Sequence, residues 1–213
     1  MHFDFESKND KINIEVVMLE YDIVCKEKNK INYIAGIDEA GRGPLAGPVV
    51  CAAVIMPLDD PIDGVDDSKK LSPKKRELLY QQIVDKALSY CIVEIDEKTI
   101  DEINILQATK LGMKRALDGL QIRPQRVLID AVKIDTDLPQ ENIIHGDAIS
   151  YSIAAASILA KVHRDRLMEK LDKKYPEYNF ARHKGYGTKE HIQNLKKFGK
   201  CEIHRDSFIK KII

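Results

Sequence analysis

The sequence lacks the features of several protein classes. No apolar run in its 213 residues approaches the ~20 residues of a membrane-spanning helix. The N-terminus has no basic region followed by an apolar one, as a secretory signal would have. The few cysteines contain no C-x-x-C pair that would indicate zinc. We therefore expect a cytoplasmic protein that does not contact a membrane and whose cysteines are free, buried thiols: Cys25, Cys51, Cys91 and Cys201.

The sequence also lacks a net charge and a nucleotide-binding P-loop. No G-x-x-x-x-G-K-[ST] motif is present, so this type of NTP site is not expected. The 34 basic and 34 acidic residues are unevenly spread, with a net charge of −7 in residues 1–66, −1 in 67–160 and +8 in 161–213. An acidic end and a basic end suit a protein that binds a polyanion at one place and cuts it at another. A Lys-rich C-terminal segment that is merely solvated is the alternative.

The sequence does contain a segment dense in glycine and proline between two strand-like runs, residues 33–39 and 48–56. This pattern predicts a hairpin whose first strand ends on Asp38 and Glu39. Neighbouring side chains alternate across a strand, so the two carboxylates converge only if the strand bends or ends there. Convergence would suit a divalent cation, and a solvated acidic pair is the alternative that these two residues leave open.

The segment Gly41-Arg42-Gly43 follows the acidic pair directly. Glycines on both sides of Arg42 let the main chain approach a ligand closely and let exposed N–H groups face an anion. A phosphate backbone is one such anion. A plain tight turn is the alternative reading of the same glycines.

The remaining pattern predicts a mixed sheet flanked by helices. Three early strands favour an antiparallel meander, and the later alternation of helix and strand favours parallel additions beside the first strand. The expected elements begin with an N-terminal appendage over about residues 1–30 that packs outside as a helix, a helix from the Ser72-Pro73 start to about Leu88, and a strand at 90–95. A long helix follows, which the Thr99–Glu102 capping box opens and whose expected core positions are Ile103, Leu106, Leu111, Met113 and Leu117. The last expected elements are strands at 126–130 and 142–145 and a helix at 148–174.

Two further aspartates follow from this topology. Asp38 and Asp130 should lie at the ends of neighbouring central strands, with Asp147 arriving from the N-terminal end of the helix at 148–174. The helix dipole favours a negative charge there, so a capping role alone would also explain Asp147. The small residues of 152–160 should let this helix lie close to the sheet and become the most buried one.

At this point the sequence resembles ribonuclease HII, the type 2 ribonuclease H family. The resemblance covers about residues 33–208 and rests on the segments Gly36–Pro44, Asp67–Lys69, Ile129–Asp130, Gly146–Asp165 and His183–Thr188. It implies a ribonuclease H-like mixed five-stranded sheet flanked by helices, with a C-terminal helical region. It also implies hydrolysis of the RNA strand of RNA/DNA hybrids and incision 5′ of a single ribonucleotide embedded in duplex DNA. The expected divisions are an N-terminal appendage of unknown role at 1–32, a catalytic core at 33–174 and a basic substrate-binding region at 175–213.

The resemblance also implies a set of site residues. The family's catalytic, metal-binding carboxylates fall on Asp38, Glu39, Asp130 and Asp147, its backbone-gripping motif on Gly41, Arg42 and Gly43, and its motif tyrosine on Tyr186. Two Mg²⁺ or Mn²⁺ ions about 3.5–4 Å apart could activate a water and stabilise the leaving oxygen, and hard ions prefer such oxygen ligands. Four like charges should repel one another without the metal.

The expected substrate is an RNA/DNA hybrid or a ribonucleotide-containing duplex DNA, and the protein is expected to bind it as a monomer. Several other residues are candidates for contact with this substrate. They are Ser68, Lys69, Lys161, Arg164 and Lys184, and each of the basic ones, taken alone, is better explained as an ordinary surface charge. Tyr186 lies between two glycines and should be exposed, so its ring could stack on a sugar and sense a 2′-OH. Asp165 lies one turn after Lys161 and is expected to form a structural ion pair with it.

Two alternatives from other classes remain open. One is a non-catalytic protein that binds RNA/DNA hybrids with the same fold, which the intact carboxylates argue against. The other is a metal-dependent phosphate-transfer protein that acts on small molecules. The Lys-rich C-terminal segment and the Gly41–Gly43 loop favour a long polyanion over a small one.

Overall fold

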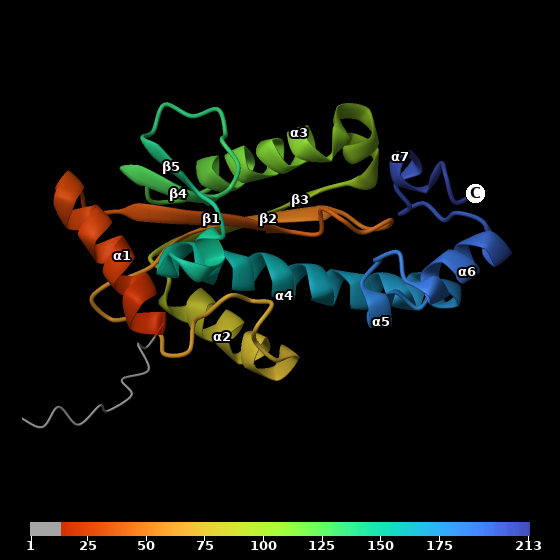
Figure 1. Ribbon diagram of the computed structural model, residues 1–213, viewed down its shortest axis with the longest axis horizontal. Coiled ribbons are helices and arrows are strands. Elements are labelled where there is room, and N and C mark those ends of the chain that lie inside the picture. The colour runs from red at the N-terminus through yellow and green to blue at the C-terminus, as the bar shows by residue number, and fades with distance from the viewer. Residues whose placement is uncertain (1–13) are drawn as a thin grey trace, which may run out of the picture.

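In the computed structural model, residues 14–213 are described, and helices cover both faces of one five-stranded sheet (Figure 1). The strands are β1 (Ile34–Ala40), β2 (Val49–Ile55), β3 (Ser89–Ile95), β4 (Arg126–Asp130) and β5 (Gln140–Ile143), in the order β3-β2-β1-β4-β5. Strands β1, β2 and β3 pair antiparallel, whereas β4 pairs with β1, and β5 with β4, in parallel. The expected mixed sheet is confirmed. The part of the N-terminal appendage at 1–13 lies outside the described residues.

The register of the sheet brings the ends of two central strands together. Asp38 in β1 pairs with Ala52 in β2, and Ile37 pairs with Ile129 in β4. Asp130 follows Ile129 directly, so the acidic ends of β1 and β4 are neighbours. This juxtaposition is the one that the strand pattern predicts.

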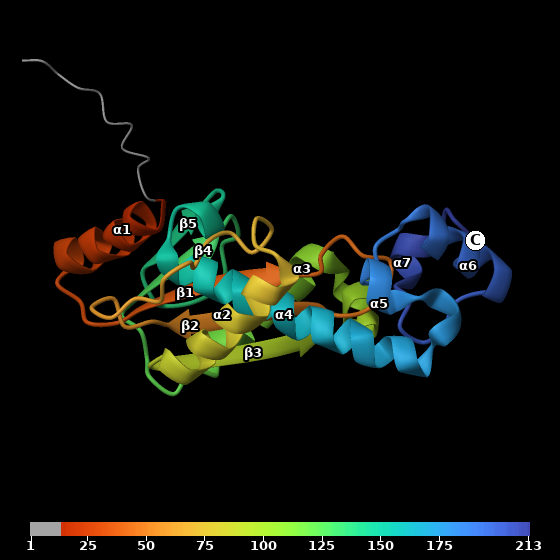
Figure 2. The ribbon, with the colours of Figure 1, turned by 90° about the horizontal axis from the view of Figure 1, so that it is seen from below.

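The helices form two layers and a terminal group. They are α1 (Ile14–Asn29), α2 (Pro73–Lys86), α3 (Glu97–Asp118), α4 (Tyr151–Lys174), α5 (Phe180–His183), α6 (Lys189–Phe198) and α7 (Asp206–Ile209). Helix α3 covers one face of the sheet, while α4 and α2 cover the other (Figure 1). Helix α1 packs near the start of α4, and α5 to α7 gather around the C-terminal part of α4 (Figure 2). Ser72 caps α2 and Pro73 begins it, as expected.

Helix α4 lies very close to the sheet. All of its residues from Tyr151 to Ala160 are buried, which confirms the expectation from their small size. A Cβ atom at Gly36 in β1 would lie 2.1 Å from the backbone carbon of Ser152. Only glycine therefore permits this approach.

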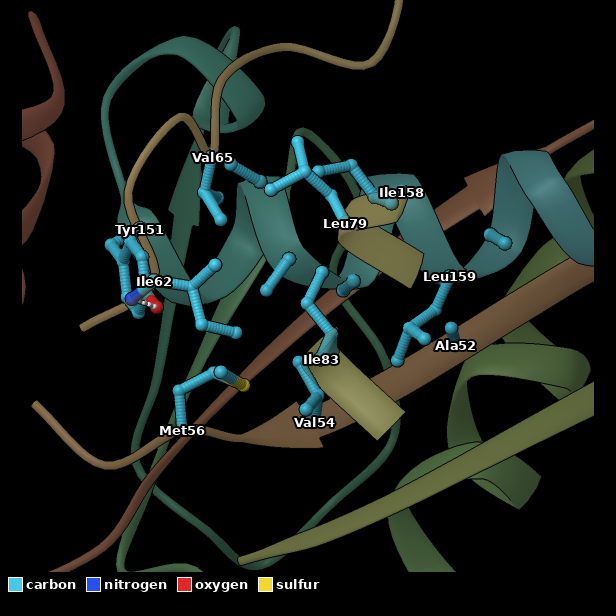
Figure 3. Close-up of a cluster of buried hydrophobic side chains, with 14 of the residues drawn as sticks. Ala52, Val54, Met56, Ile62, Val65, Leu79, Ile83, Tyr151, Ile158 and Leu159 are labelled. Atoms are coloured by element: carbon cyan, nitrogen blue, oxygen red, sulfur yellow. Dashed lines mark hydrogen bonds between the residues drawn. The ribbon is translucent and has the colours of Figure 1, made fainter. Parts of the chain in front are cut away.

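Apolar side chains fill the layer between α2, α4 and the sheet (Figure 3). Leu79 and Ile83 of α2 meet Ile158 of α4 and Val54 of β2 in this cluster. At its edge the Tyr151 hydroxyl accepts a hydrogen bond of 2.8 Å from the backbone N–H of Ile62. This bond fastens the long loop after β2 to the start of α4.

Three expected element boundaries are wrong. Helix α3 begins at Glu97, with Asp96 rather than Thr99 as its N-cap, because the Asp96 carboxylate accepts the Thr99 N–H. The helix is also broken at Asn104, where φ is 66°, and Leu106 beyond the break is exposed instead of in the core. Strand β5 covers Gln140–Ile143 rather than 142–145.

The third wrong boundary is the start of α4, and it changes the role of Asp147. This residue lies in a 3₁₀ turn, Gly146–Ala148, ahead of α4. Helix α4 starts at Tyr151, and Ser150 caps it by accepting the N–H of Ile153. Asp147 is therefore not the cap of this helix.

All four cysteines are free thiols, but only Cys25 and Cys51 are buried, so the expectation of burial holds for two of them. Within residues 14–213, no helix has the length and apolar character needed to cross a membrane.

Candidate active site

A cavity of about 220 Å³ opens where β1 and β4 end. Eleven of the thirteen residues around it are ones that the sequence analysis selected: Asp38, Glu39, Gly41, Arg42, Gly43, Ser68, Lys69, Asp130, Lys161, Arg164 and Tyr186. Strand β1 runs only one residue past Glu39, and both members of the acidic pair line the same cavity. We call this cavity the cleft.

Asp38 and Glu39 carry buried charge. Burial raises the pKa of Asp38 well above its usual range, and the nearby charges of Glu39, Asp130 and Asp147 raise it further. Burial also raises the pKa of Glu39, while Arg42, 3.5 Å from its Oε1 atom, opposes that rise. One Asp38 oxygen accepts the backbone N–H of Glu39 at 2.7 Å. The acidic pair is held in a conformation that its own repulsion opposes.

Asp130 fastens the turn that carries Asp147. Its Oδ1 atom accepts the backbone N–H of Gly146 at 2.8 Å. A Cβ atom at Gly146 would lie 2.6 Å from the Cδ1 atom of Ile153, so a side chain there would push the turn away from α4. A hydrogen bond to the end of β4 and a close packing contact thus set the position of the fourth carboxylate.

Asp147 forms an ion pair with Lys69. The Lys69 Nζ atom lies 2.9 Å from Asp147 Oδ2, and the backbone N–H of Lys69 is bonded to Asp67. Burial disfavours the ammonium, but its hydrogen bond to Asp147 and the surrounding acids outweigh that effect and raise the pKa of Lys69. Lys69 is therefore a permanent cation beside the acidic group.

The donor set fits hard divalent ions, although the ligands are not fully gathered. Among residues 14–213, no three His, Cys, Asp or Glu side chains already surround one point as metal ligands. Glu39 Oε2 is nevertheless buried and has no hydrogen-bond partner within the described chain. Carboxylate oxygens are what Mg²⁺ and Mn²⁺ prefer. A metal that bound the Oδ2 atom of Asp147 would have to displace the ammonium of Lys69.

The glycine-rich loop lines the cleft beside Tyr186. Gly41 has a φ of 98°, and a Cβ atom there would lie 2.1 Å from the Nε atom of Arg164. A Cβ atom at Gly43 would lie 3.6 Å from the Cε1 atom of Tyr186, so loop and ring are neighbours. Tyr186 is 46% exposed, which confirms that its ring is free at the surface.

Three other candidates for substrate contact, Lys161, Lys184 and Ser68, differ in whether they line the cleft and in whether they are buried. Lys161 lines the cleft and forms the expected ion pair with Asp165 at 2.7 Å. Lys184 lines a neighbouring hollow and pairs with Glu169 at 2.7 Å. Ser68 is buried, and its hydroxyl shares a 2.7 Å hydrogen bond with that of Ser157.

Arg164 is not the exposed phosphate contact that the sequence suggests. It is 1% exposed, and its guanidinium donates to the carbonyls of Pro48 at 3.0 Å, Ala46 at 3.1 Å and Lys184 at 2.9 Å. Arg205, which the sequence does not single out, is a second buried arginine bonded to the same loop. The local sequence does not indicate that either arginine side chain is buried, because arginines are mostly exposed in proteins.

Comparisons with known proteins agree with this geometry. Residues 35–211 match the family described as ribonuclease HII. The ribonuclease HII of Ruminiclostridium cellulolyticum is 60% identical over 183 residues, which cover 85% of this chain and 72% of that protein. The ribonuclease HII of Caldicellulosiruptor saccharolyticus is 56% identical over 87% of this chain and 91% of its own length. The crystal structure of ribonuclease H2 from Pyrococcus horikoshii OT3 superposes with a TM-score of 0.73 at 30% identity, over 85% of this chain and 97% of that one.

The family match includes the whole sheet except its first residue, the residues of the cleft and the C-terminal helices. The expected fold is confirmed by a structure that is alike over most of both chains. The chain therefore belongs to the ribonuclease HII family and is a metal-dependent endoribonuclease that hydrolyses the RNA strand of RNA/DNA hybrids.

Proposed function

We propose that this protein also incises duplex DNA on the 5′ side of a single embedded ribonucleotide. The observation that supports this most is the position of Tyr186, which is exposed at the cleft and lies next to Gly43 of the glycine-rich loop. A backbone loop and an aromatic ring that lie next to each other in one cleft can test the sugar of a single nucleotide. We also propose the division into a core at 33–174 and a basic substrate-binding region at 175–213, to which Tyr186 belongs.

Four carboxylates would hold the metal. Two divalent ions, Mg²⁺ or Mn²⁺, bound by Asp38, Glu39, Asp130 and Asp147 would supply an activated water and stabilise the charge of the leaving oxygen. Asp130 holds the turn that carries Asp147 in place. Glu39 offers a buried oxygen without a hydrogen-bond partner in the described chain. Asp147 offers a carboxylate whose Oδ2 atom is paired with Lys69.

The remaining cleft residues would position the nucleic acid. Lys69 and Lys161 offer charge to phosphates, and such contacts fix the register without reading bases. The peptide N–H groups of the Gly41–Gly43 loop would bind the backbone at the scissile junction. Arg42 is paired with Glu39, so its side chain links the loop to the metal site.

Selection of a ribonucleotide must occur in the catalytic step. One 2′-OH contributes about one net hydrogen bond, roughly 1 kcal/mol or fivefold in affinity, which is far too little against an excess of DNA. The main chain around Arg42 would hold the 2′-OH, and Tyr186 would bond to it and stack on the next deoxyribose. The scissile phosphate would then reach the metal only at the correct junction.

Single-turnover cleavage of two substrates tests this role of Tyr186. Tyr186→Phe should keep its affinity for the duplex but lose rate on a duplex with one ribonucleotide, and Tyr186→Ala should lose more because stacking is removed too. The all-RNA/DNA hybrid is the reference substrate and should be less affected. Equal slowing of both substrates, or no slowing, would contradict the junction-sensing role.

Two controls separate the proposed activity from its alternatives. Wild-type protein should cut the single-ribonucleotide duplex and leave the same duplex made only of DNA intact. Duplex nucleic acid should compete with this cleavage, whereas a small phosphate ester at the same phosphate concentration should not. Binding without cleavage in the presence of Mg²⁺ would instead support a non-catalytic hybrid-binding protein.

A further inference from the structure

Arg205 is a buried arginine that no part of the proposed function uses. It lies just before α7, is 0% exposed and reaches back to the loop between β1 and β2. Its Nη2 atom donates to the Gly41 carbonyl at 2.6 Å, its Nη1 atom to the Arg42 carbonyl at 2.9 Å and its Nε atom to the Gly47 carbonyl at 2.9 Å. All three acceptors belong to the loop that lines the cleft.

These bonds decide where the N–H groups of the loop point. In a trans peptide the C=O group and the N–H group of the next residue point in opposite directions. The described chain contains no cis peptide bonds. With the carbonyls of Gly41 and Arg42 turned toward Arg205, the N–H groups of Arg42 and Gly43 point away from it. Gly41, Arg42 and Gly43 line the cleft, whereas Arg205 is not among the residues that line it.

Arg205 also contributes a charge that no adjacent carboxylate neutralises. Neither Arg205 nor Arg164 takes part in an ion pair within residues 14–213. Burial and the nearby Arg164 lower the pKa of Arg205 to about 9, and Glu97 and Asp101 oppose this from a distance. A buried charge without a counter-ion is costly, and a bound anion would relieve that cost.

The backbone of the C-terminal segment strengthens the same connection. The N–H of Arg205 donates to the Leu45 carbonyl at 2.9 Å, and the N–H of Gly47 donates to the Ile203 carbonyl at 2.9 Å. The ring of Phe208 covers the guanidinium at 5.1 Å from its centroid. Loop and C-terminal segment therefore form one unit.

We propose that Arg205 is a positioning residue for the substrate, which aims the peptide N–H groups of Arg42 and Gly43, and its own positive charge, at one phosphate of the nucleic-acid backbone. This inference rests on the substrate-binding role proposed above for the Gly41–Gly43 loop. Arg205 itself does not touch the substrate.

The test uses the full chain and an RNA/DNA hybrid in Ca²⁺, which allows binding without turnover. Affinity is measured for hybrids in which one phosphate at a time is a neutral methylphosphonate, with wild-type protein, Arg205→Lys and the matched control Arg123→Lys. Arg123 is an exposed arginine paired with Asp137 and lies outside the cleft. Unfolding curves verify that each variant is folded.

Wild-type protein and the control should lose about tenfold in affinity at one particular phosphate, since hydrogen bonds to a charged group are lost there. Arg205→Lys keeps a charge but cannot hold three carbonyls, so it should bind the unmodified hybrid about tenfold more weakly and show no further loss at that phosphate. A methylphosphonate penalty in Arg205→Lys equal to that of wild type would overturn the proposal. A loss of affinity at every phosphate alike would also overturn it.

A second measurement does not depend on the folding of a variant. In wild-type protein, the amide NMR signals of Arg42 and Gly43 should shift on addition of the hybrid and should not shift when the critical phosphate is a methylphosphonate. Unchanged amide signals with the normal hybrid would overturn the proposal. Failure of the proposed function is distinct, because it would appear as wild-type protein that cuts hybrids but leaves the single-ribonucleotide duplex intact.

Discussion

Two groups of buried charge flank the cleft, and they differ in how their charge is satisfied. In the acidic group, Asp38, Glu39, Asp130 and Asp147, burial and the neighbouring like charges raise the pKa of Asp38, and Glu39 keeps an oxygen without a hydrogen-bond partner among residues 14–213. The basic group, Arg164 and Arg205, has its donors bonded to backbone carbonyls.

This difference separates a group that awaits a ligand from one that shapes the protein. Burial raises the pKa of Asp38 and of Glu39, so these two acids cost stability until a bound cation compensates their charge. The arginines satisfy carbonyls that would otherwise be buried without donors, so each of them supports the fold. Removing one member of each group should therefore have opposite effects on stability.

Asp38→Asn should produce the largest change in activity. Loss of one metal-binding carboxylate should lower kcat on an RNA/DNA hybrid by about a thousandfold or more, equivalent to about 4 kcal/mol. In EDTA the same variant should be more stable than wild type by about 1 kcal/mol, since a buried charge is removed. Cleavage kinetics and urea unfolding measure the two effects. Near-normal turnover with Mg²⁺ would contradict the assignment of Asp38.

Arg164→Met should act in the opposite direction on stability. Three backbone carbonyls lose their donor, and we expect a loss of about 3 kcal/mol in the free energy of unfolding. Arg166→Met on the same helix is the matched control, because Arg166 is only partly buried and pairs with Glu77. The control should lose less than about 1 kcal/mol. Similar losses of unfolding free energy in the two variants would contradict the special role of the buried Arg164.

Metal addition should stabilise the acidic group and leave the basic one unaffected. At a Mg²⁺ concentration of about 100 Kd, wild-type protein should gain about 2.7 kcal/mol in the free energy of unfolding relative to EDTA. Arg164→Met should show the same gain, and Asp38→Asn a much smaller one. Thermal unfolding with and without Mg²⁺ measures this. An undiminished gain in Asp38→Asn would place the metal elsewhere.

The smallest expected effect is a pH dependence of stability that comes from Asp22. This residue is a buried acid of α1 that lies away from the cleft, so it can be compared with the acids of the cleft. Its oxygens accept the Ser150 hydroxyl at 2.7 Å and the Ser152 N–H at 2.8 Å, and burial raises its pKa to about 6. The folded protein thus binds this proton more tightly than the unfolded chain does. The stabilisation is complete below about pH 3.8 and is lost as the pH rises through about 6.

Asp22→Asn should remove this pH dependence. Between pH 5 and 7, wild-type protein should lose about 1 kcal/mol of stability relative to the variant. Urea unfolding at pH 5, 6 and 7 measures the difference. Parallel pH profiles for the two proteins would show that Asp22 titrates as an ordinary exposed acid.

Much of the fold could be predicted from local pattern. Alternating and continuous apolar runs located the strands, and the change from hairpin to helix–strand units predicted the mixed sheet. The same order of elements placed Asp38 and Asp130 at neighbouring strand ends, which the register confirms. The small residues of the first half of α4 predicted its burial. The resemblance to ribonuclease HII then supplied the roles of these residues.

Only the tertiary structure decided how the remaining polar residues are used. Asp147 lies in a turn held by Asp130 rather than at a helix cap, and Lys69 reaches it from 78 positions away. Arg205 bonds to Gly41, 164 positions earlier in the chain. The periodicity of apolar residues reports which face of an element is buried, because burial of a face needs many residues with regular spacing. A single arginine turned inward leaves no such pattern, since its burial depends on carbonyls that distant parts of the chain bring to it.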